Sequence, residues 1–218
     1  MEATEFLTLC LANGIIIGQE QFLQLKRYAK ELAYWNGQVN LISRKDIDNI
    51  WDKHILHSLA AVKYIKFPNR AKCLDVGTGG GLPGIPIAIA VPDCRMLLID
   101  SIGKKIKIAD MLAKHTELKH ITAKQARAEE ISAVREYRKS FDLIFSRSVA
   151  RIKPVVRWIT DLLKPGGRLI FYKGGDLREE FDEAREAFPK LQFEEIKISM
   201  FGCEWFEQEE KKLVVCRI

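Results

Sequence analysis

The sequence predicts an α/β fold, a doubly wound and mostly parallel sheet with an antiparallel terminal strand and an α-helical N-terminal extension. From residue 72 onward, short apolar strands alternate with helical segments, the order typical of a parallel sheet covered by helices on both faces. Residues 1 to about 66 instead place apolar side chains at helical spacing, without an alternating strand pattern. We therefore expect a helical extension over residues 1–68, packed on the core, and an α/β domain over residues 69–218.

The extension contains two expected helices separated by a turn. In the first, apolar residues share one helical face at positions 22, 25, 28, 29 and 32. Asn and Gly within residues 35–41 interrupt this pattern, and a second helix is expected over residues 47–65. Residues 67–70, Phe-Pro-Asn-Arg, then form the expected linker to the α/β domain.

The α/β domain repeats a strand and a helix along the chain. Strands are expected at residues 73–76, 96–100, 121–123, 141–145 and 168–172. Helices are expected at residues 85–90, 104–114, 152–163 and 177–188. The last two strands, near residues 193–199 and 212–216, follow each other without a helix between them, so we expect an antiparallel pair at the end.

A glycine-rich loop, residues 75–84 with the sequence DVGTGGGLPG, follows the first strand of the domain. Ligands of doubly wound sheets bind at the carboxyl ends of the strands, where this loop lies. Glycine permits tight turns and the close approach of a ligand, and free N–H groups at the start of the next helix can face its polar atoms. The loop therefore predicts a cofactor site, with a ligand-free glycine turn as the alternative.

Two classes of cofactor fit this loop. Gly79, Gly81 and Gly84 have the spacing of the dinucleotide fingerprint GxGxxG. Asp100 ends the next strand, where an acid binds ribose hydroxyls in either class. A nicotinamide-dependent dehydrogenase is therefore a rival interpretation.

Three features favour S-adenosylmethionine over a dinucleotide. Asp75 would repel a pyrophosphate, whereas it suits the zwitterionic amino-acid end of a sulfonium cofactor. Glu129 follows the third strand and can accept a hydrogen bond from an adenine amino group, although alone it would be interpreted as a helix cap. Residues 162–170 and the final strand pair have the layout of methyltransferase sheets. S-adenosylmethionine is thus the expected cofactor.

Composition argues against several other classes. Hydrophobic residues make up 47% and charged residues 29% of the chain, as in folded soluble proteins. The cysteines include no Cys-x-x-Cys pair, and His54 and His57 belong to no His-Glu-x-x-His motif, so we expect no metal. No apolar run reaches the roughly 18 residues that span a bilayer, and residues 1–13 lack the features of a secretory signal. We expect a cytoplasmic protein without a membrane partner.

The formal net charge of +6 is weak evidence for a nucleic-acid partner, since many basic proteins bind none. Basic side chains gather in two stretches, which form either a phosphate-binding surface or solvated helix faces. They are Lys104, Lys105 and Lys107, and then Arg135, Arg138, Lys139, Arg147, Arg151, Lys153 and Arg157.

Short motifs along nearly the whole chain carry a family resemblance. They are Trp35-Asn36 with Asn40-Leu41, residues 54–59 (HILHSL), the loop 75–86, Asp100-Ser101 with Gly103-Lys104-Lys105, Arg127-Ala128-Glu129, Ser146-Arg147 and Tyr172-Lys173-Gly174. In these motifs the chain resembles the bacterial 16S ribosomal RNA guanine-N7 methyltransferases once named glucose-inhibited division protein B. LPGIP at residues 82–86 is more specific than the glycines alone. His57 replaces an acidic residue of many relatives and Gly80 replaces Ala or Pro, which bears on substrate contacts rather than on cofactor binding.

The resemblance implies a Rossmann-like methyltransferase fold and a set of cofactor contacts. The implied contacts with S-adenosylmethionine are Gly77, Gly79 and Leu82 beneath it, Asp100 at its ribose, Ala128 and Glu129 at its adenine, and Arg147 at the border of the site. The implied partner is 16S ribosomal RNA, within the small ribosomal subunit. We expect a monomer.

The implied reaction needs no general base, because N7 of guanine already carries an exposed lone pair. Arg147 and Lys173 end the fourth and fifth strands, where they could hold the phosphate of the target nucleotide or its guanine O6. Structural ion pairs with Asp75 or Asp100 are the alternative for both residues. If Arg147 holds the substrate, Arg147→Ala should lower methyl transfer much more than it disturbs folding.

Other interpretations stay open at this point. For Asn40 and His54 in the extension, we expect hydrogen bonding in the core first and RNA contact second. A methyltransferase of a small metabolite or protein would share the cofactor site but lack productive RNA binding. A noncatalytic RNA-binding assembly factor would bind RNA without turnover.

Overall fold

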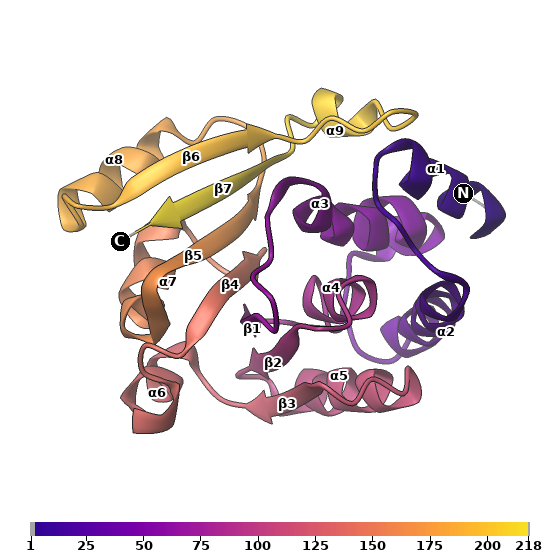
Figure 1. The fold of residues 1–218 in the computed structure, drawn as a ribbon, viewed down its shortest axis with the longest axis horizontal. Coiled ribbons are helices and arrows are strands. Elements are labelled where there is room, and N and C mark those ends of the chain that lie inside the picture. The colour runs from indigo at the N-terminus through magenta and orange to yellow at the C-terminus, as the bar shows by residue number, and fades with distance from the viewer. Residues whose placement is uncertain (1–2, 218) are drawn as a thin grey trace.

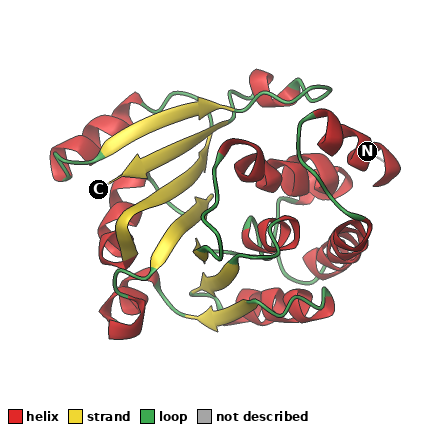
Figure 2. Cartoon of the chain, in the orientation of Figure 1, coloured by secondary structure: helices red, strands yellow, loops and turns green. Residues whose placement is uncertain are grey.

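The computed structural model describes residues 3–217, which form a central sheet between two layers of helices (Figures 1 and 2). Residues 1, 2 and 218, at the outer ends of the two expected domains, lie outside the described residues. The strands follow the order β3-β2-β1-β4-β5-β7-β6; β1 to β5 are parallel, and β7 pairs antiparallel with both β5 and β6. The strands are β1 (Lys72–Val76), β2 (Arg95–Asp100), β3 (Ile121–Gln125), β4 (Phe141–Arg147), β5 (Leu163–Lys173), β6 (Gln192–Lys197) and β7 (Lys212–Arg217).

Helices cover both faces of this sheet, which confirms the predicted fold class. Successive side chains of a strand point to opposite faces, so Cys73 and Leu74 of β1 belong to different apolar clusters. One face carries α6, α7 and α8, and the other carries α3, α4 and α5 with α1 and α2 outside them (Figure 1). The helices are α1 (Ala3–Ala12), α2 (Gln19–Asn36), α3 (His57–Tyr64), α4 (Gly84–Ala90), α5 (Gly103–His115), α6 (Ala128–Ala133), α7 (Ile152–Ile159), α8 (Arg178–Ala187) and α9 (Trp205–Gln208).

The N-terminal helices share an apolar cluster with one face of the sheet. Leu32 of α2 and Ile55 are fully buried in the cluster that also contains Leu112 of α5. The Tyr28 hydroxyl donates a hydrogen bond of 2.9 Å to the carbonyl of Gly80, within the glycine-rich loop. The boundary at residue 68 stays a prediction, but the extension clearly forms part of the surroundings of this loop.

The second helical segment of the extension passes through three geometries. It begins as a 3-10 helix, η1 (Arg44–Asn49), continues as a π-helix, η2 (Ile50–Leu56), and ends as α3. The sequence predicted helix over residues 47–65 without these changes of geometry. π-Helical turns are rare overall, and those that occur often lie at functional sites. The side chains of η2 are therefore candidates for a functional role.

Two expectations about the carboxyl-terminal half were wrong. The helix expected over residues 152–163 ends at Ile159, and after the short 3-10 helix η4 (Thr160–Leu162) the chain already pairs as β5 at Leu163. Pro165 keeps a helix from continuing past Lys164, and the pairing of Leu163 with Phe141 in the sheet ends the helical segment earlier still. The last two strands do pair antiparallel, but the one-turn helix α9 lies between them, anchored by the fully buried Phe206.

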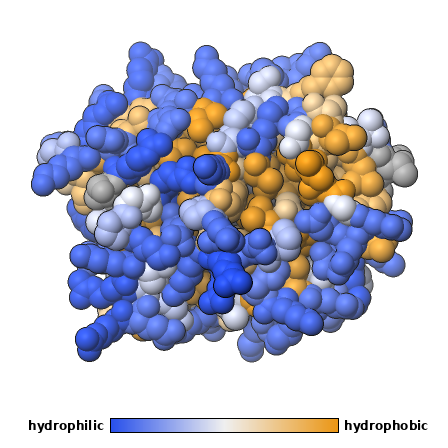
Figure 3. All heavy atoms as spheres, viewed as in Figure 1, coloured by the Kyte–Doolittle hydropathy of each residue, from blue (hydrophilic) through white to orange (hydrophobic). Residues whose placement is uncertain are grey.

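Exposed apolar residues are concentrated near the N-terminal helices, on the right of the view in Figure 3. Leu11, Ile16 and Phe201 are 69%, 79% and 77% exposed.

Within residues 3–217, no helix combines the length and the apolar composition that crossing a bilayer requires.

Candidate functional site

Asp75, near the end of β1, ties together the two ends of the glycine-rich loop. Its Oδ2 accepts hydrogen bonds from the Thr78 hydroxyl at 2.6 Å and from the Gly84 amide at 2.9 Å. The side chain is fully buried, and this burial raises the pKa of the carboxyl group to about 7, although the two hydrogen bonds act in the opposite direction. Asp75 therefore shapes the loop from within the protein.

Asp100, at the end of β2, connects this loop to the neighbouring strand. Its Oδ2 accepts a hydrogen bond from the Gly79 amide and its Oδ1 accepts one from the Ile102 amide, each at 2.9 Å. Gly77 and Gly79 have φ angles of 66° and 56°, in the left-handed region that favours glycine. At Gly77 a Cβ atom would lie 2.5 Å from the side chain of Val149, so this glycine also permits a close approach.

Two pockets meet where these strands end. The larger has a volume of about 500 Å³ and is lined by the glycine-rich loop, by residues of the segment 40–57 and by residues of the segment 205–211. The smaller has a volume of about 300 Å³ and is lined by the end of β2, the start of α6 and residues near Val149. Gly77, Asp100, Lys105 and Ser148 line both, so the two pockets adjoin at the ends of β1 and β2.

The pockets bring together most of the predicted cofactor contacts. The larger pocket is lined by Gly77, Gly79, Leu82, Asp100 and Arg147, and the smaller one by Gly77, Asp100, Ala128 and Glu129. Asp75 is the exception, because its carboxylate bonds to the loop and the residue belongs to neither lining in the described chain.

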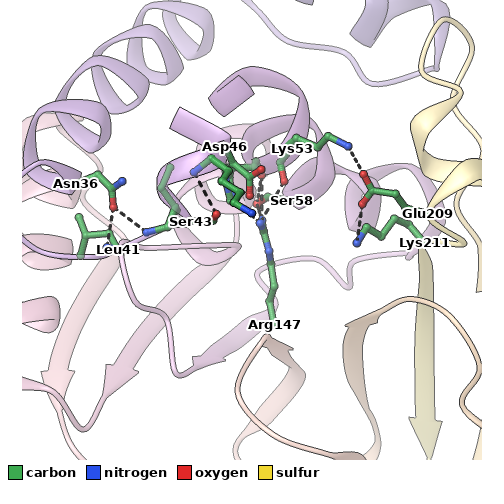
Figure 4. A network of polar contacts seen from close by, with 12 residues as sticks. Asn36, Leu41, Ser43, Asp46, Lys53, Ser58, Arg147, Glu209 and Lys211 are labelled. Atoms are coloured by element: carbon green, nitrogen blue, oxygen red, sulfur yellow. Dashed lines mark hydrogen bonds and ion pairs between the residues drawn. The ribbon is translucent and has the colours of Figure 1, made fainter. Parts of the chain in front are cut away.

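Arg147 reaches from the end of β4 into the helical extension (Figure 4). Its guanidinium group donates to the carbonyls of Lys53 and His54, each at 3.2 Å, to the Ser58 hydroxyl at 3.3 Å, and to Nδ1 of His54 at 2.6 Å. Burial lowers the pKa of Arg147, while Tyr172, Tyr28 and Asp75 raise it. The alternative considered for Arg147, an ion pair with Asp75 or Asp100, is absent among the described residues, and Arg147 instead binds η2 to the end of β4.

Lys173, at the end of β5, lies apart from both pockets. Its ammonium group forms an ion pair of 2.8 Å with Glu180 and donates a hydrogen bond of 3.0 Å to the carbonyl of Ala150. Its ion-pair partner is therefore neither Asp75 nor Asp100. Lys173 is thus already paired, and it lines neither pocket. The geometry therefore does not support a role for Lys173 in holding the substrate.

The sequence did not assign a role in the site to most of the helical extension. Asn40 was expected in the core, but it is exposed and lines the larger pocket, whereas Asn36 is buried and accepts from the amides of Leu41 and Ile42 at 2.8 and 2.9 Å. His54 is buried and hydrogen-bonded as expected, and it also lines the pocket. The further lining residues without an assigned role are Leu41, Ile42, Ser43, Asp46, Lys53, His57, Trp205, Glu209 and Lys211.

Solved structures of methyltransferases share this fold at low sequence identity. The tRNA methyltransferase TrmK of Bacillus subtilis, described as M1A22-specific, superposes with a TM-score of 0.55 at 16% identity, over 76% of this chain and 65% of that chain. The ribosomal protein L11 methylase of Lactobacillus delbrueckii gives a TM-score of 0.54 at 17% identity, over 74% of this chain and 76% of that chain. These likenesses concern the fold alone.

Sequence comparison is more specific. A relative from Chlorobium phaeobacteroides, named ribosomal RNA small subunit methyltransferase G, is 43% identical over 180 residues, which cover 83% of this chain and 79% of the relative. A relative of the same name from Flavobacterium psychrophilum is 43% identical over 198 residues, covering 87% of this chain and 89% of the relative. The model of the GidB family, rRNA small subunit methyltransferase G, matches residues 21–211. The resemblance inferred from the motifs is thereby confirmed, and the chain belongs to the GidB family of rRNA small subunit methyltransferase G.

Proposed function

We propose that this protein transfers a methyl group from S-adenosylmethionine to N7 of a guanine in 16S ribosomal RNA. Family membership supports a ribosomal RNA methyltransferase. The observation on which the proposal depends most is the pair of adjoining pockets that share Gly77 and Asp100 at the carboxyl ends of β1 and β2, where doubly wound sheets bind their ligands.

The residues present fit S-adenosylmethionine. Asp100 accepts one backbone hydrogen bond on each oxygen and keeps further lone pairs for ribose hydroxyls, at the junction of the two pockets. Oδ1 of Asp75 is buried without a hydrogen-bond partner in the described chain, but the residue lines neither pocket, so the fit depends on Asp100. In this assignment the amino-acid end lies along Gly77, Gly79 and Leu82 in the larger pocket.

The smaller pocket is assigned to adenine. Ala128 and Glu129 begin α6 and line this pocket, and the exposed Glu129 carboxylate can accept from the amino group of the base. The alternative, a nicotinamide dinucleotide, would place its pyrophosphate on the loop above the buried Asp75, whose carboxylate would repel it. Calorimetry with S-adenosylmethionine and with NAD separates the two, since only the cofactor of the protein should give a binding isotherm.

Methyl transfer to N7 requires the protein to position the two reactants and requires no proton transfer. The bound cofactor would supply a methyl group on a sulfonium, and the lone pair of N7 forms the new bond as the bond to sulfur breaks. The protein therefore acts by holding the two reactants aligned and about 3 Å apart, which can supply much of the rate enhancement. Arg147 borders the larger pocket and fixes the position of η2, the segment that closes one side of it.

We infer 16S ribosomal RNA within an assembled or partly assembled small subunit, acted on by a monomer in the cytoplasm. The net charge of +6 supports a polyanionic partner, whose affinity should then fall steeply as salt rises. A guanine in structured RNA has to be exposed or flipped before it can enter the larger pocket.

The direct test uses S-adenosylmethionine with a labelled methyl group and small ribosomal subunits from a strain that lacks this modification. After incubation with the purified protein, the RNA is digested and the labelled nucleoside is identified. We expect the label in 7-methylguanosine. Label in another nucleoside, or none in RNA despite measurable binding of S-adenosylmethionine, would contradict the proposal and direct the search to another substrate or to a noncatalytic role.

A further inference from the structure

The larger pocket has a wall for which the cofactor assignment provides no role. The glycine-rich loop and Asp100 account for the cofactor, whereas the helical segment 44–57 contributes Asp46, His54 and His57 to the same pocket. The two histidines lie three residues apart, His54 near the end of η2 and His57 at the start of α3, and both line the pocket. Both residues are buried, each with 6% of its surface exposed.

His54 provides a hydrogen-bond donor without a partner. Its Nδ1 lies 2.6 Å from a guanidinium nitrogen of Arg147, which can only donate, so Nδ1 accepts and Nε2 carries the ring proton. Nε2 is buried and has no hydrogen-bond partner among the described residues. The carboxylate of Asp46 stands 3.6 Å away, beyond hydrogen-bond distance. Burial and the charge of Arg147 lower the pKa of His54 to about 3, so the ring is neutral.

His57 provides the complementary group, an acceptor without a partner. The ring is hydrogen-bonded to the backbone of Lys53, in the direction that raises its pKa, so the ring nitrogen in that bond carries the proton. In a neutral imidazole the other nitrogen is an acceptor, and the buried Nε2 of His57 has no partner in the described chain. Burial and Arg147 hold the pKa of His57 well below its usual value, which keeps the ring neutral.

One pocket wall therefore carries one unused donor and one unused acceptor. Buried polar groups in proteins are nearly always paired, so two such atoms on a single wall indicate a ligand that supplies both partners. Guanine carries the acceptor O6 next to the donor N1–H, whereas adenine carries a donor amino group next to the acceptor N1. The wall matches guanine and opposes adenine.

We propose that His54 and His57 recognise the target base and select guanine over adenine, an inference that rests on the proposed function. The Nε2–H group of His54 donates a hydrogen bond to O6, and Nε2 of His57 accepts a hydrogen bond from N1–H. The same orientation leaves N7, the neighbour of O6 on the other side, free to meet the methyl group. Both nitrogens are covered in this structure, so the base reaches them when side chains of the wall move aside.

The experiment varies single atoms of the base. Small subunits are reconstituted around ribosomal RNA that carries guanine, hypoxanthine, 2-aminopurine or adenine at the methylated position, and kcat/KM for methyl transfer is measured. Hypoxanthine keeps O6 and N1–H but lacks the 2-amino group, whereas 2-aminopurine keeps that group and lacks both others. We expect hypoxanthine within about 3-fold of guanine, and 2-aminopurine and adenine reduced by about 10- to 100-fold, the discrimination typical of base-specific hydrogen bonds.

Variants of His57 then test whether this residue causes the discrimination between the bases. His57→Leu should lower kcat/KM for guanine about 10-fold and leave kcat/KM for 2-aminopurine unchanged. His57→Gln, which keeps an acceptor, should restore part of the ratio of kcat/KM for guanine to that for 2-aminopurine. Glu209→Gln, in the same pocket, should not change the ratio. Calorimetry with S-adenosylmethionine reports whether each variant keeps its cofactor site, and if His57→Leu does not fold, the base series in the wild type and His57→Gln decides.

Two outcomes overturn this inference alone. One is 2-aminopurine as good a substrate as guanine with hypoxanthine reduced, which would mean that the 2-amino group is recognised instead of O6 and N1–H. The other is an equal reduction for all four bases in His57→Leu, which would mark His57 as purely structural. Absence of label from every base overturns the proposed function and this inference with it.

Discussion

The glycine-rich loop and the helical wall of the larger pocket, residues 44–57, are built by contacts of very different range. Asp75 bonds to Gly84, nine residues away, so the loop is organised by its own neighbours in the sequence. Arg147 bonds to the carbonyl of Lys53, 94 residues away, so the wall depends on the folded sheet. A sequence motif therefore predicts the part of the site that local contacts form, whereas the wall can be identified only in the folded structure.

The ionisation of Asp75 tests the loop and has the largest expected effect. Its pKa is raised from 3.8 to about 7, so the folded state favours the protonated form, and this contribution to stability is lost as pH rises from 3.8 towards 7. Asp75→Asn removes the titration, so the wild type should lose up to about 4 kcal/mol relative to the variant over this range. Urea unfolding at several pH values measures the difference.

The control for this prediction is Asp161→Asn, because Asp161 is 61% exposed and pairs with Arg138 on the surface. We expect no comparable change with pH in that variant. Parallel stability curves for Asp75→Asn and the wild type would mean that the buried carboxyl group keeps an ordinary pKa.

Arg147→Ala tests the wall. The substitution leaves the buried carbonyls of Lys53 and His54 without their charged donor, at a cost of about 2–4 kcal/mol in the free energy of unfolding. Amide exchange in η2 should rise and methyl transfer should fall together with stability. Parallel losses would contradict the sequence-based expectation that Arg147→Ala lowers methyl transfer much more than it disturbs folding.

Arg147→Lys separates charge from geometry in the same place. Lysine keeps the positive charge but cannot reproduce the fork of donors that contacts Lys53, His54 and Ser58. We expect it to recover only a small part of the stability. Full recovery would show that charge alone holds the wall.

Sequence and structure agree where patterns are local. The strand ends, the loop and Asp100 could be predicted because strands alternate with helices and because glycine spacing marks a ligand-binding turn. The π-helical turn η2 could not be predicted, since its contacts come from Arg147. Neither could the position of Glu209 at the pocket, which follows from α9 and the antiparallel return of β7.

The glycines of the loop provide a smaller effect with an internal control. At Gly84 a Cβ atom would lie 2.3 Å from Leu98 and 2.8 Å from a carboxylate oxygen of Asp75, so Gly84→Ala should cost about 1–3 kcal/mol by overpacking. At Gly79 the nearest atom is 3.6 Å away, and only the positive φ of 56° opposes a side chain, at about 1 kcal/mol. Thermal unfolding compares the two. Equal losses would show that the loop can relax around Gly84, contrary to its description as a tightly tied turn.

The smallest effect is expected at the rim of the pocket, where Glu209 joins the wall to the segment before β7 (Figure 4). Glu209 pairs with Lys53 and, at 3.1 Å, with Lys211, and these partners hold its pKa below the usual value. Its side chain is 45% exposed, so Glu209→Gln should cost less than about 1 kcal/mol, and less at high salt. Glu194→Gln, which breaks the similarly exposed pair with Arg217, is the matched control, measured by urea unfolding at two salt concentrations. A loss for Glu209 well above that control would mean that this ion pair, and not Arg147 alone, holds the wall in place.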